Sequence, residues 1–296
     1  MTISYIIRPI MASFARGQHL GPYETLERIG AGGMGEVWKA RDTRLGRLVA
    51  IKVSKEKFSE RFGREARSIA ALNHPHICTL HDVGADYLVM EYVEGKVLKG
   101  PLPVDEVLRL AIQIAEAVEH AHQHGVIHRD LKPANILVTR SGVKVLDFGL
   151  AKLIGADSAS GSPTELDATL TQGLTQEGMI VGTPRYMAPE QLEGQEADRR
   201  SDVFAFGLVL YEMITGRPAF EGKTNANVMA AILAAEPKPV TSYQTLIPPA
   251  LDHLIKTCLA KDPNDRRQSM HDVLLELRWT AESASDAGIS RPAMAH

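Results

Sequence analysis

The chain has 296 residues, of which 44% are hydrophobic and 23% are charged. This length can bury a sizeable core in one large domain or in two smaller lobes. Lysine and arginine total 33 against 36 acidic residues, so the net charge of −3 gives no general attraction to nucleic acid or to an anionic membrane. No apolar stretch approaches the roughly 20 residues of a transmembrane helix, so we expect no membrane segment in this chain.

Only two cysteines occur, Cys78 and Cys258, far apart and without a metal-ligand motif around them. We interpret them as buried, reduced thiols rather than as a disulfide, which is typical of a cytoplasmic protein. The hydrophobic start of the chain is interrupted by Arg8 and follows no charged region. We therefore do not expect a signal peptide.

The first part of the chain has the pattern of a small, sheet-rich lobe. Residues 1–20 are expected to be a flexible leader. Helical spacing with many charges predicts one amphipathic helix over residues 58–72. Short alternating segments separated by turn residues predict five strands, over residues 23–29, 35–41, 48–53, 78–83 and 87–92. This lobe would cover about residues 21–90.

After a linker at residues 91–93 the pattern becomes mainly helical. A second lobe is predicted over residues 94–278, and residues 279–296 are expected to be a flexible tail. Residues 152–182 are rich in Gly, Ser and Thr and predict a long mobile loop, which in a compact domain is more often functional than accidental. Helices are predicted over residues 103–123, 201–215, 224–235, 248–260 and 269–278, with short strands over 136–138 and 143–146.

The most informative stretch is residues 128–135, with the sequence His-Arg-Asp-Leu-Lys-Pro-Ala-Asn, followed by Asp147-Phe148-Gly149. One carboxylate in such a set can orient a hydroxyl and accept its proton, while a lysine faces the transferred phosphate. An asparagine and a second aspartate can hold a divalent metal. The spacing therefore indicates phosphoryl transfer.

A glycine-rich segment, Gly30-Ala31-Gly32-Gly33-Met34-Gly35, precedes a predicted strand. Dinucleotide-binding turns share this glycine spacing, but they lead from a strand into a helix. Here the glycines join two strands, so they predict a hairpin that can fold over phosphates, because glycine amides approach a ligand closely. A purely structural hairpin turn remains an alternative on this motif alone.

Lys52 lies within the hydrophobic run Val49-Ala50-Ile51-Lys52. A buried ammonium needs an acidic partner. Glu65 in the predicted helix is the natural candidate, and Glu60 is a weaker rival. That pair would place Lys52 on the α- and β-phosphates of ATP.

With these motifs in order, the chain resembles the eukaryotic-type serine/threonine protein kinases, particularly the bacterial branch, from about Tyr23 to Leu277. Further matches are residues 182–190, 201–207 and 262–266. The resemblance implies an α+β, bilobal protein-kinase fold. It also implies transfer of the γ-phosphoryl group of ATP, with Mg²⁺, to Ser/Thr hydroxyls of proteins, including autophosphorylation of the long loop.

The resemblance also assigns roles to single residues. Asp130 would deprotonate the substrate hydroxyl and Lys132 would neutralise the transferred phosphoryl group. Asn135 and Asp147 would hold Mg²⁺. The structural roles that it implies are a link from Thr183 to Asp130 and Lys132, an ion pair between Glu190 and Arg266, and hydrogen bonds from the backbone near His128 to Asp202.

The same resemblance implies an adenine pocket between the lobes. Backbone groups of Glu91 and Val93 would bind the base, and Met90 would border the back of the pocket. Apolar faces would come from Ile29, Val37, Ala50 and Leu137. A stack of Ile69, Leu80, His128 and Phe148 is expected in the active enzyme.

Two features depart from the family pattern or extend it. The segment at residues 94–103 is short, so the helix usually found there is expected to be reduced to a turn. The resemblance implies that Arg129, which precedes Asp130, takes part in control by phosphorylation of the long loop, with the phosphate paired to this arginine. The candidates are Thr169, Thr171 and Thr175, and Glu177 is expected to supply part of that charge.

Two other functions compete with an active protein kinase. One is a catalytically inactive pseudokinase scaffold, although none of Lys52, Asp130, Asn135 and Asp147 is lost. The other is a small-molecule kinase of the same fold, against which the segment at residues 183–190 favours a peptide substrate.

Overall fold

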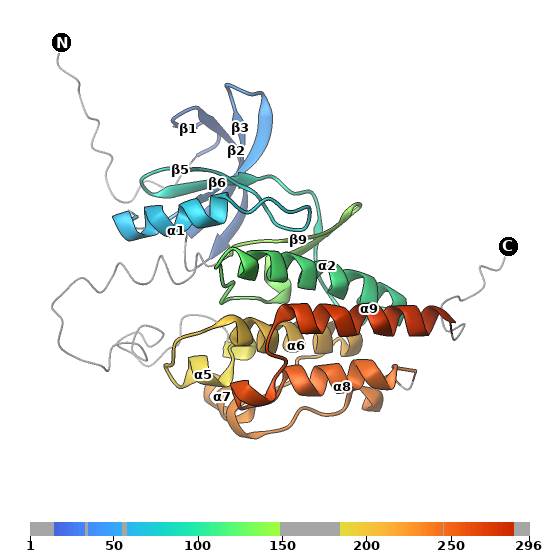
Figure 1. Cartoon of the computed structure of the whole chain (residues 1–296). Coiled ribbons are helices and arrows are strands. Elements are labelled where there is room, and N and C mark those ends of the chain that lie inside the picture. Colours follow the sequence, from blue (N-terminus) through green and yellow to red (C-terminus); the bar gives the residue numbers. More distant parts are fainter. Residues whose placement is uncertain (1–14, 33–34, 55–57, 149–183, 245, 287–296) are drawn as a thin grey trace, which may run out of the picture.

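The computed structural model describes residues 15–32, 35–54, 58–148, 184–244 and 246–286. Figure 1 shows a sheet-rich lobe above a larger, mainly helical lobe. This bilobal α+β arrangement confirms the predicted fold. The predicted mobile loop at residues 152–182 lies outside the described residues.

The small lobe is a six-stranded antiparallel sheet in the order β1-β2-β3-β4-β6-β5. Its strands are β1 (His19–Leu20), β2 (Tyr23–Gly32), β3 (Gly35–Asp42), β4 (Arg47–Val53), β5 (Leu80–Val83) and β6 (Tyr87–Glu91). Side chains alternate between the two faces of β4. Val49 and Ile51 enter a core with Trp38, whereas Ala50 and Lys52 point to the opposite face. That opposite face is where the site forms.

Helix α1 (Glu60–Ala70) covers part of the sheet. Ser59 caps its start, because the Ser59 hydroxyl accepts a hydrogen bond from the Phe62 amide at 3.2 Å. Phe62 and Ile69 are buried with Leu80 and Leu88 of the sheet. The amphipathic pattern therefore correctly located helix α1.

The prediction of a flexible leader over residues 1–20 is wrong for its last residues. His19–Leu20 form β1 and pair with β2, and the buried Thr25 hydroxyl donates to the Ala15 carbonyl at 2.7 Å. A two-residue strand is too short to give an alternating pattern, so the sequence did not reveal it. Residues 1–14 of the leader lie outside the described part of the chain.

The large lobe is built around α6, which is buried over most of its length. Its helices are α2 (Val104–Gln123), α5 (Pro189–Leu192), α6 (Arg199–Thr215), α7 (Asn225–Ala234), α8 (Pro249–Cys258) and α9 (Met270–Asp286). Short 3-10 turns occur at Pro133–Asn135, Pro184–Tyr186, Val240–Ser242 and Pro263–Asp265. Asp198 caps α6 and Gly216 ends it in the left-handed conformation. Asp202, a charged residue in the first turn of α6, is therefore buried inside the large lobe.

The predicted tail is also corrected. Helix α9 continues to Asp286 rather than ending near residue 278, and it lies along α2 (Figure 1). Thr280 is buried at 2% exposure and donates to the Glu276 carbonyl at 2.7 Å. Residues 279–286 lack a strong apolar repeat, which is why the sequence suggested a tail. Residues 287–296 are not among those described.

Between the lobes a second sheet contains β7 (Lys96–Val97), β8 (Ile136–Thr139) and β9 (Gly142–Val145). The chain passes from β7 to α2 without a further helix, which agrees with the expected reduction of the post-linker helix to a turn.

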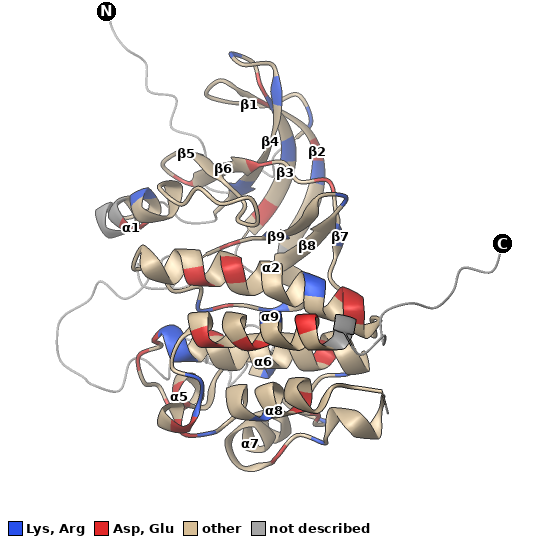
Figure 2. Cartoon of the chain, turned by 45° about the vertical axis from the view of Figure 1, so that its right-hand side comes forward, with Lys and Arg blue, Asp and Glu red and all other residues tan. Residues whose placement is uncertain are grey.

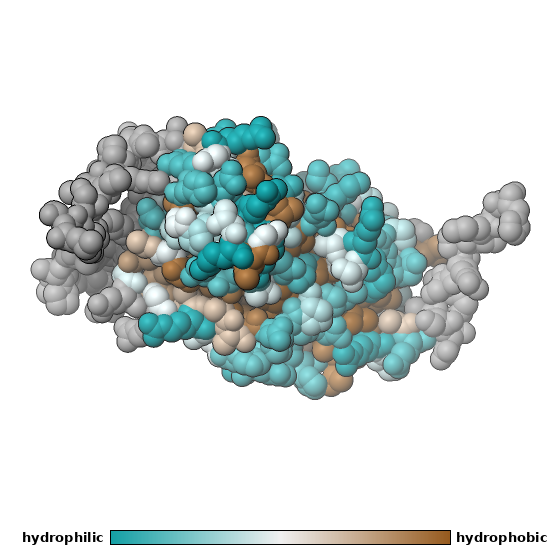
Figure 3. Space-filling view, turned by 90° about the horizontal axis from the view of Figure 1, so that it is seen from above, coloured by the Kyte–Doolittle hydropathy of each residue, from teal (hydrophilic) through white to brown (hydrophobic). Residues whose placement is uncertain are grey.

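Seen from above, hydrophobic residues on the surface are interspersed with hydrophilic ones (Figure 3). Among the described residues, no helix has the length and apolar character needed to cross a bilayer.

Candidate active site

Asp202 of α6 anchors the loop that carries the predicted catalytic residues. Its carboxylate accepts hydrogen bonds from the His128 and Arg129 amides, both at 2.8 Å. His122 Nε2 lies 2.7 Å from the same group. Burial alone would raise the pKa of Asp202, but the His122 contact and the His128 amide outweigh it and lower that pKa. The predicted anchoring of the loop by Asp202 is thus present in the structure.

Arg129 shows why this loop needs an anchor. Its φ angle is 65°, in the left-handed region. For a residue with a side chain this conformation costs roughly 1–2 kcal/mol. The hydrogen bond to Asp202 and a 3.3 Å contact from Gln191 Nε2 to the Arg129 carbonyl hold it there. Asp202 and Gln191 therefore hold the Arg129 backbone in this conformation from its amide and from its carbonyl.

The predicted catalytic residues meet at Asp130. Lys132 Nζ donates to both carboxylate oxygens of Asp130, at 2.9 and 2.7 Å. Asn135 Nδ2 donates to the Asp130 carbonyl at 2.8 Å and to its Oδ2 at 3.0 Å. The Asp130 and Lys132 side chains keep 31% and 33% of their surface exposed. A hydroxyl can therefore reach the carboxylate, with a cation beside it.

The donor set at Asn135 and Asp147 fits a magnesium ion. The two Asn135 contacts use its Nδ2, so its Oδ1 is left as an acceptor. The Leu146 amide donates to the Asn135 carbonyl at 2.8 Å, which brings Asp147 beside this residue. Mg²⁺ in phosphate-transfer sites is held by one or two carboxylates and by phosphate oxygens. The predicted metal ligands are compatible with this chemistry.

Lys52 of β4 contacts Asp147, which comes after β9. Its Nζ is 2.9 Å from Asp147 Oδ2, and the two side chains are 11% and 26% exposed. The sequence predicted an acidic partner for Lys52, and this contact supplies one. The proposed pair with Glu65 stays a prediction.

Phe148 follows Asp147 and is buried against His128, with ring centroids 4.6 Å apart. Ile69 and Leu80 belong to the same buried cluster as Phe148. His128 is itself fully buried, and its Nε2 lies 3.0 Å from the Leu146 carbonyl. The residues of the expected stack are therefore all in the interior between the lobes.

Most of the predicted adenine-pocket residues lie on neighbouring strands of the small-lobe sheet. Ala50 of β4 pairs with Met90 of β6, and Val37 of β3 pairs with Gly30 of β2. Leu137 is on β8. Ile29 is 46% exposed, so it lies at the outer edge. The apolar residues named for the pocket therefore come from both lobes. That a base binds to them stays a prediction.

The linker offers fewer free groups than the sequence suggested. The Glu91 amide already donates to the Thr79 carbonyl at 2.9 Å. Its carbonyl lies 3.6 Å from Cys78 Sγ, a weak donor, and its carboxylate pairs with Lys144 at 2.8 Å. Of the Glu91 backbone groups the carbonyl therefore remains for a base, and hydrogen bonds from it and from Val93 to a base stay a prediction.

The described residues of the glycine-rich segment lie at the ends of β2 and β3, which pair as an antiparallel hairpin, as predicted. Gly35 has a φ angle of 131°, and a Cβ there would lie 1.8 Å from the Val53 carbonyl oxygen. A Cβ at Gly30 would make only an ordinary 3.6 Å contact with Val37. Gly35 is thus required by the fold, whereas Gly30 is not.

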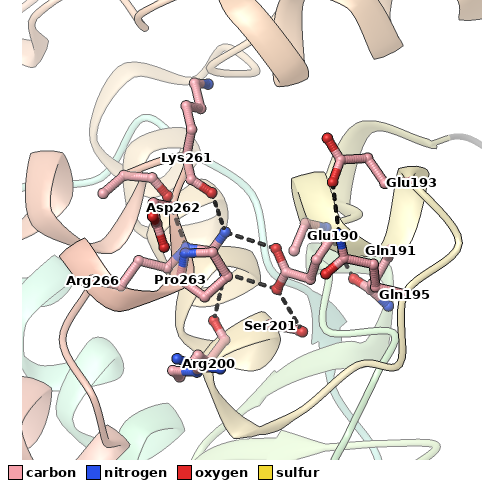
Figure 4. A network of polar contacts seen from close by, with 12 residues as sticks. Glu190, Gln191, Glu193, Gln195, Arg200, Ser201, Lys261, Asp262, Pro263 and Arg266 are labelled. Carbon is pink, nitrogen blue, oxygen red and sulfur yellow. Dashed lines mark hydrogen bonds and ion pairs between the residues drawn. The ribbon is translucent and has the colours of Figure 1, made fainter.

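The predicted pair between Glu190 and Arg266 is a buried, two-point ion pair (Figure 4). The Arg266 guanidinium donates to Glu190 at 2.8 and 2.7 Å, and the side chains are 0% and 8% exposed. Ser201 donates to Glu190 at 2.7 Å. Burial opposes ionisation of Glu190, but these hydrogen bonds lower its pKa. The pair fixes the segment after Pro184 to the large lobe.

The sequence did not identify three supporting residues: His122 beside Asp202, Ser201 beside Glu190, and Lys144 beside Glu91. For His122 a signal existed, because it lies four positions after Val118 on the apolar face of α2, and a polar side chain on a buried face requires a partner. The partners are distant in sequence, so they could not be assigned. Gly149, Thr169, Thr171, Thr175, Glu177 and Thr183, for which functions were also predicted, are outside the described residues.

Comparison with known proteins gives a consistent result. The family described as the protein kinase domain matches residues 23–279. The serine/threonine-protein kinase PknB of Mycolicibacterium smegmatis is 38% identical over 282 residues, which cover 88% of this chain and 43% of that protein. PrkC of Bacillus subtilis, also a serine/threonine-protein kinase, is 37% identical, with coverages of 87% and 40%. The chain thus spans about two fifths of the length of these curated relatives.

Among solved structures, the kinase domain of PknI from Mycobacterium tuberculosis superposes with a TM-score of 0.68 at 26% sequence identity. The match covers 90% of this chain and 100% of that domain. Both lobes described above therefore have a counterpart in a known structure.

Proposed function

Because this chain belongs to the protein kinase family, in its bacterial serine/threonine branch, we propose that it is an active enzyme that uses ATP and Mg²⁺. Its substrates would be Ser/Thr hydroxyls of proteins, including its own. The observation that carries this proposal is the contact of Lys132 with both oxygens of Asp130. An acceptor for a proton and a cation for a phosphoryl group are thereby adjacent.

In this proposal, Asp130 orients the substrate hydroxyl and accepts its proton as the hydroxyl oxygen attacks the γ-phosphorus of ATP. The bond from the γ-phosphorus to the bridging oxygen breaks, and ADP leaves with that electron pair. Lys132 stabilises the negative charge on the transferred group. Bound Mg²⁺, held by Asn135 and Asp147, would supply further charge neutralisation on the phosphates.

Lys52 and the β2–β3 hairpin would hold the rest of the nucleotide. Lys52 is mostly buried, 2.9 Å from Asp147, so its ammonium can contact phosphates that lie beside the metal-binding carboxylate. Gly30 has no side chain, so phosphates can approach its backbone closely. These contacts would position the γ-phosphoryl group rather than activate it.

The inactive-scaffold alternative has less support, because Asp130 and Lys52 each have a charged partner within 3 Å that fits catalysis. A small-molecule kinase is also disfavoured. Glu190 and Arg266 fix the segment after Pro184 to the large lobe, in the position where a peptide substrate would bind in this family.

Incubation of the protein with γ-labelled ATP and Mg²⁺, followed by phosphoamino acid analysis and peptide mapping, tests the proposal. Label on serine or threonine is expected, including one or more of Thr169, Thr171 and Thr175. Absence of label on the kinase and on an added protein mixture, with ATP binding intact, would favour the scaffold. Label on a small metabolite alone would favour a small-molecule kinase.

A further inference from the structure

A groove of about 670 Å³ is lined by residues that follow the linker, together with residues of β8 and α2. It lies between the β7–β8 pair and the N-terminal half of α2; Figure 2 shows β7 above that end of the helix. We call it the β7–α2 groove. Its lining includes Lys96, Val97, Leu98, Lys99, Leu102 and Leu110. Ligand pockets commonly have volumes of roughly 300–1,000 Å³, so its size suits a bound group.

The floor of the β7–α2 groove is apolar. Leu98 and Leu110 are anchored in the core, at 2% and 0% exposure, whereas Val97 at the mouth is 43% exposed. Leu102 is half-buried between them. An exposed valine above a leucine floor can be covered by one bulky apolar side chain of a partner.

The rim of the groove is basic. Lys96 and Lys99 are both exposed, and within the described part of the chain neither makes an ion pair. Glu106 also lines the groove, but Arg109 lies 3.6 Å from it and balances its charge. The uncompensated charge around the apolar floor is therefore positive.

The groove is preformed because its wall is fixed to the large lobe. The Leu98 amide donates to the Ile136 carbonyl at 2.9 Å, and the Leu102 amide donates to the Met213 carbonyl at 2.8 Å. Between them, a Cβ on Gly100 would lie 2.0 Å from the Glu212 carbonyl oxygen, so this segment lies directly on α6. No helix intervenes between β7 and α2 to cover the opening.

We propose that the β7–α2 groove is a docking site for a segment of the protein substrate in which one bulky apolar residue is flanked by Asp or Glu. The apolar side chain enters the groove and the carboxylates pair with Lys96 and Lys99. The inference rests on the proposed kinase function. Docking beside the cleft raises the local concentration of the substrate hydroxyl without using any catalytic residue.

A protein segment fits better than a membrane surface. The apolar residues of the groove lie on a concave wall, whereas a bilayer requires a protruding or flat apolar face. The two lysines flank a site the size of a few side chains. Short acidic-apolar peptides match both the shape and the charge.

The binding test uses the whole chain and a fluorescein-labelled peptide with the core Asp-Glu-Leu-Glu-Asp, followed by anisotropy. One control peptide has alanine in place of leucine and another has Lys-Arg-Leu-Arg-Lys. Only the acidic-apolar peptide should bind. The double variant Lys96→Glu/Lys99→Glu should weaken binding by about tenfold or more, because attraction becomes repulsion. The matched control is Lys223→Glu/Lys238→Glu, at exposed lysines elsewhere, and it should bind normally.

The kinetic test compares one phosphorylatable peptide with and without the fused docking core. In Lys96→Glu/Lys99→Glu the KM of the fused substrate should rise while kcat and the rate on the short peptide stay unchanged. Equal binding of all three peptides, normal binding by the double variant, or binding only to phosphatidylserine vesicles would overturn the proposal. If no peptide is phosphorylated by any form, the proposed function fails, while the anisotropy result still decides the docking site.

Discussion

Lys52 Nζ lies 2.9 Å from Asp147 Oδ2, although the two residues are 95 positions apart in the sequence. The contact links β4 of the small lobe to the second residue after β9. It places a mostly buried ammonium beside the proposed metal ligand. In this geometry Lys52 can act on phosphates that share the metal, and its role can be tested separately from folding.

We predict that Lys52→Met lowers kcat by about 10²- to 10³-fold, because an electrostatic contact to the phosphates is lost. Steady-state phosphorylation kinetics with varied ATP measures this. Lys238→Met, at an exposed position, is the matched control and should keep the wild-type rate. An unchanged kcat in Lys52→Met would show that the contact with Asp147 is structural only.

The Glu190–Arg266 pair should dominate the stability of its segment. Glu190→Gln leaves the fully buried Arg266 without its counter-charge, so the free energy of unfolding should fall by about 3–5 kcal/mol. The exposed pair of Glu116 with Arg278 provides the control, and Glu116→Gln should cost about 0–1 kcal/mol. Urea unfolding measures both. Similar losses in the two variants would contradict the buried-pair account.

Two glycines of the β2–β3 hairpin should respond differently to alanine. At Gly35 a Cβ would meet the Val53 carbonyl oxygen at 1.8 Å, so Gly35→Ala should lower the melting temperature. At Gly30 a Cβ would make only an ordinary 3.6 Å contact with Val37, so Gly30→Ala should leave the melting temperature unchanged. It should raise the KM for ATP, because the added methyl group limits the close approach of phosphates to the backbone. Thermal unfolding and ATP-dependent kinetics separate the two effects. An unchanged KM in Gly30→Ala would remove this residue from the phosphate site.

Stability should decrease in mild acid because of a histidine cluster between the lobes. The ring centroids of His74 and His120 are 5.1 Å apart, and those of His120 and His124 are 4.4 Å apart. Burial, and then the neighbouring His120 and His76, lower the pKa of His74; burial and His124 lower that of His120. Lys144 acts on His74 in the same direction, and Glu116 opposes it.

The folded state therefore binds fewer protons than the unfolded state below the ordinary histidine pKa of about 6.5. The stabilisation is complete above that pH and is lost as the pH falls toward the lowered pKa of the folded protein. The melting temperature should drop between about pH 7.5 and about pH 5.5. His74→Gln should reduce that drop, whereas His271→Gln, at an exposed position, should not. Equal drops in both variants would exclude the cluster as the cause.

The elements that the sequence located best are those with local signals. The apolar repeat of α2 and the loop at residues 128–135 both depend on neighbours in sequence, and the short spacing of Asp130, Lys132 and Asn135 allows their side chains to meet. Contacts across the fold could be named only where the family resemblance supplied them, as for Glu190 and Arg266. His122 and its contact with Asp202, 80 residues away, were missed for that reason.

The remaining errors have physical causes too. β1 is only two residues long and exists because it pairs with β2, which no local pattern records. The last turns of α9 are stabilised by packing of Thr280 and not by an apolar repeat. The β7–α2 groove arises from three segments that meet only in the folded chain.

The central claim, that Asp130 is the group that accepts the substrate proton, is tested most directly by single-turnover phosphoryl transfer with Asp130→Asn. Asparagine keeps the shape of the side chain but lacks the basic carboxylate. We predict that ATP binding and the melting temperature are retained while the transfer rate falls by about 10²- to 10⁴-fold, the usual contribution of a general base. A transfer rate equal to that of the unmodified protein would contradict the account.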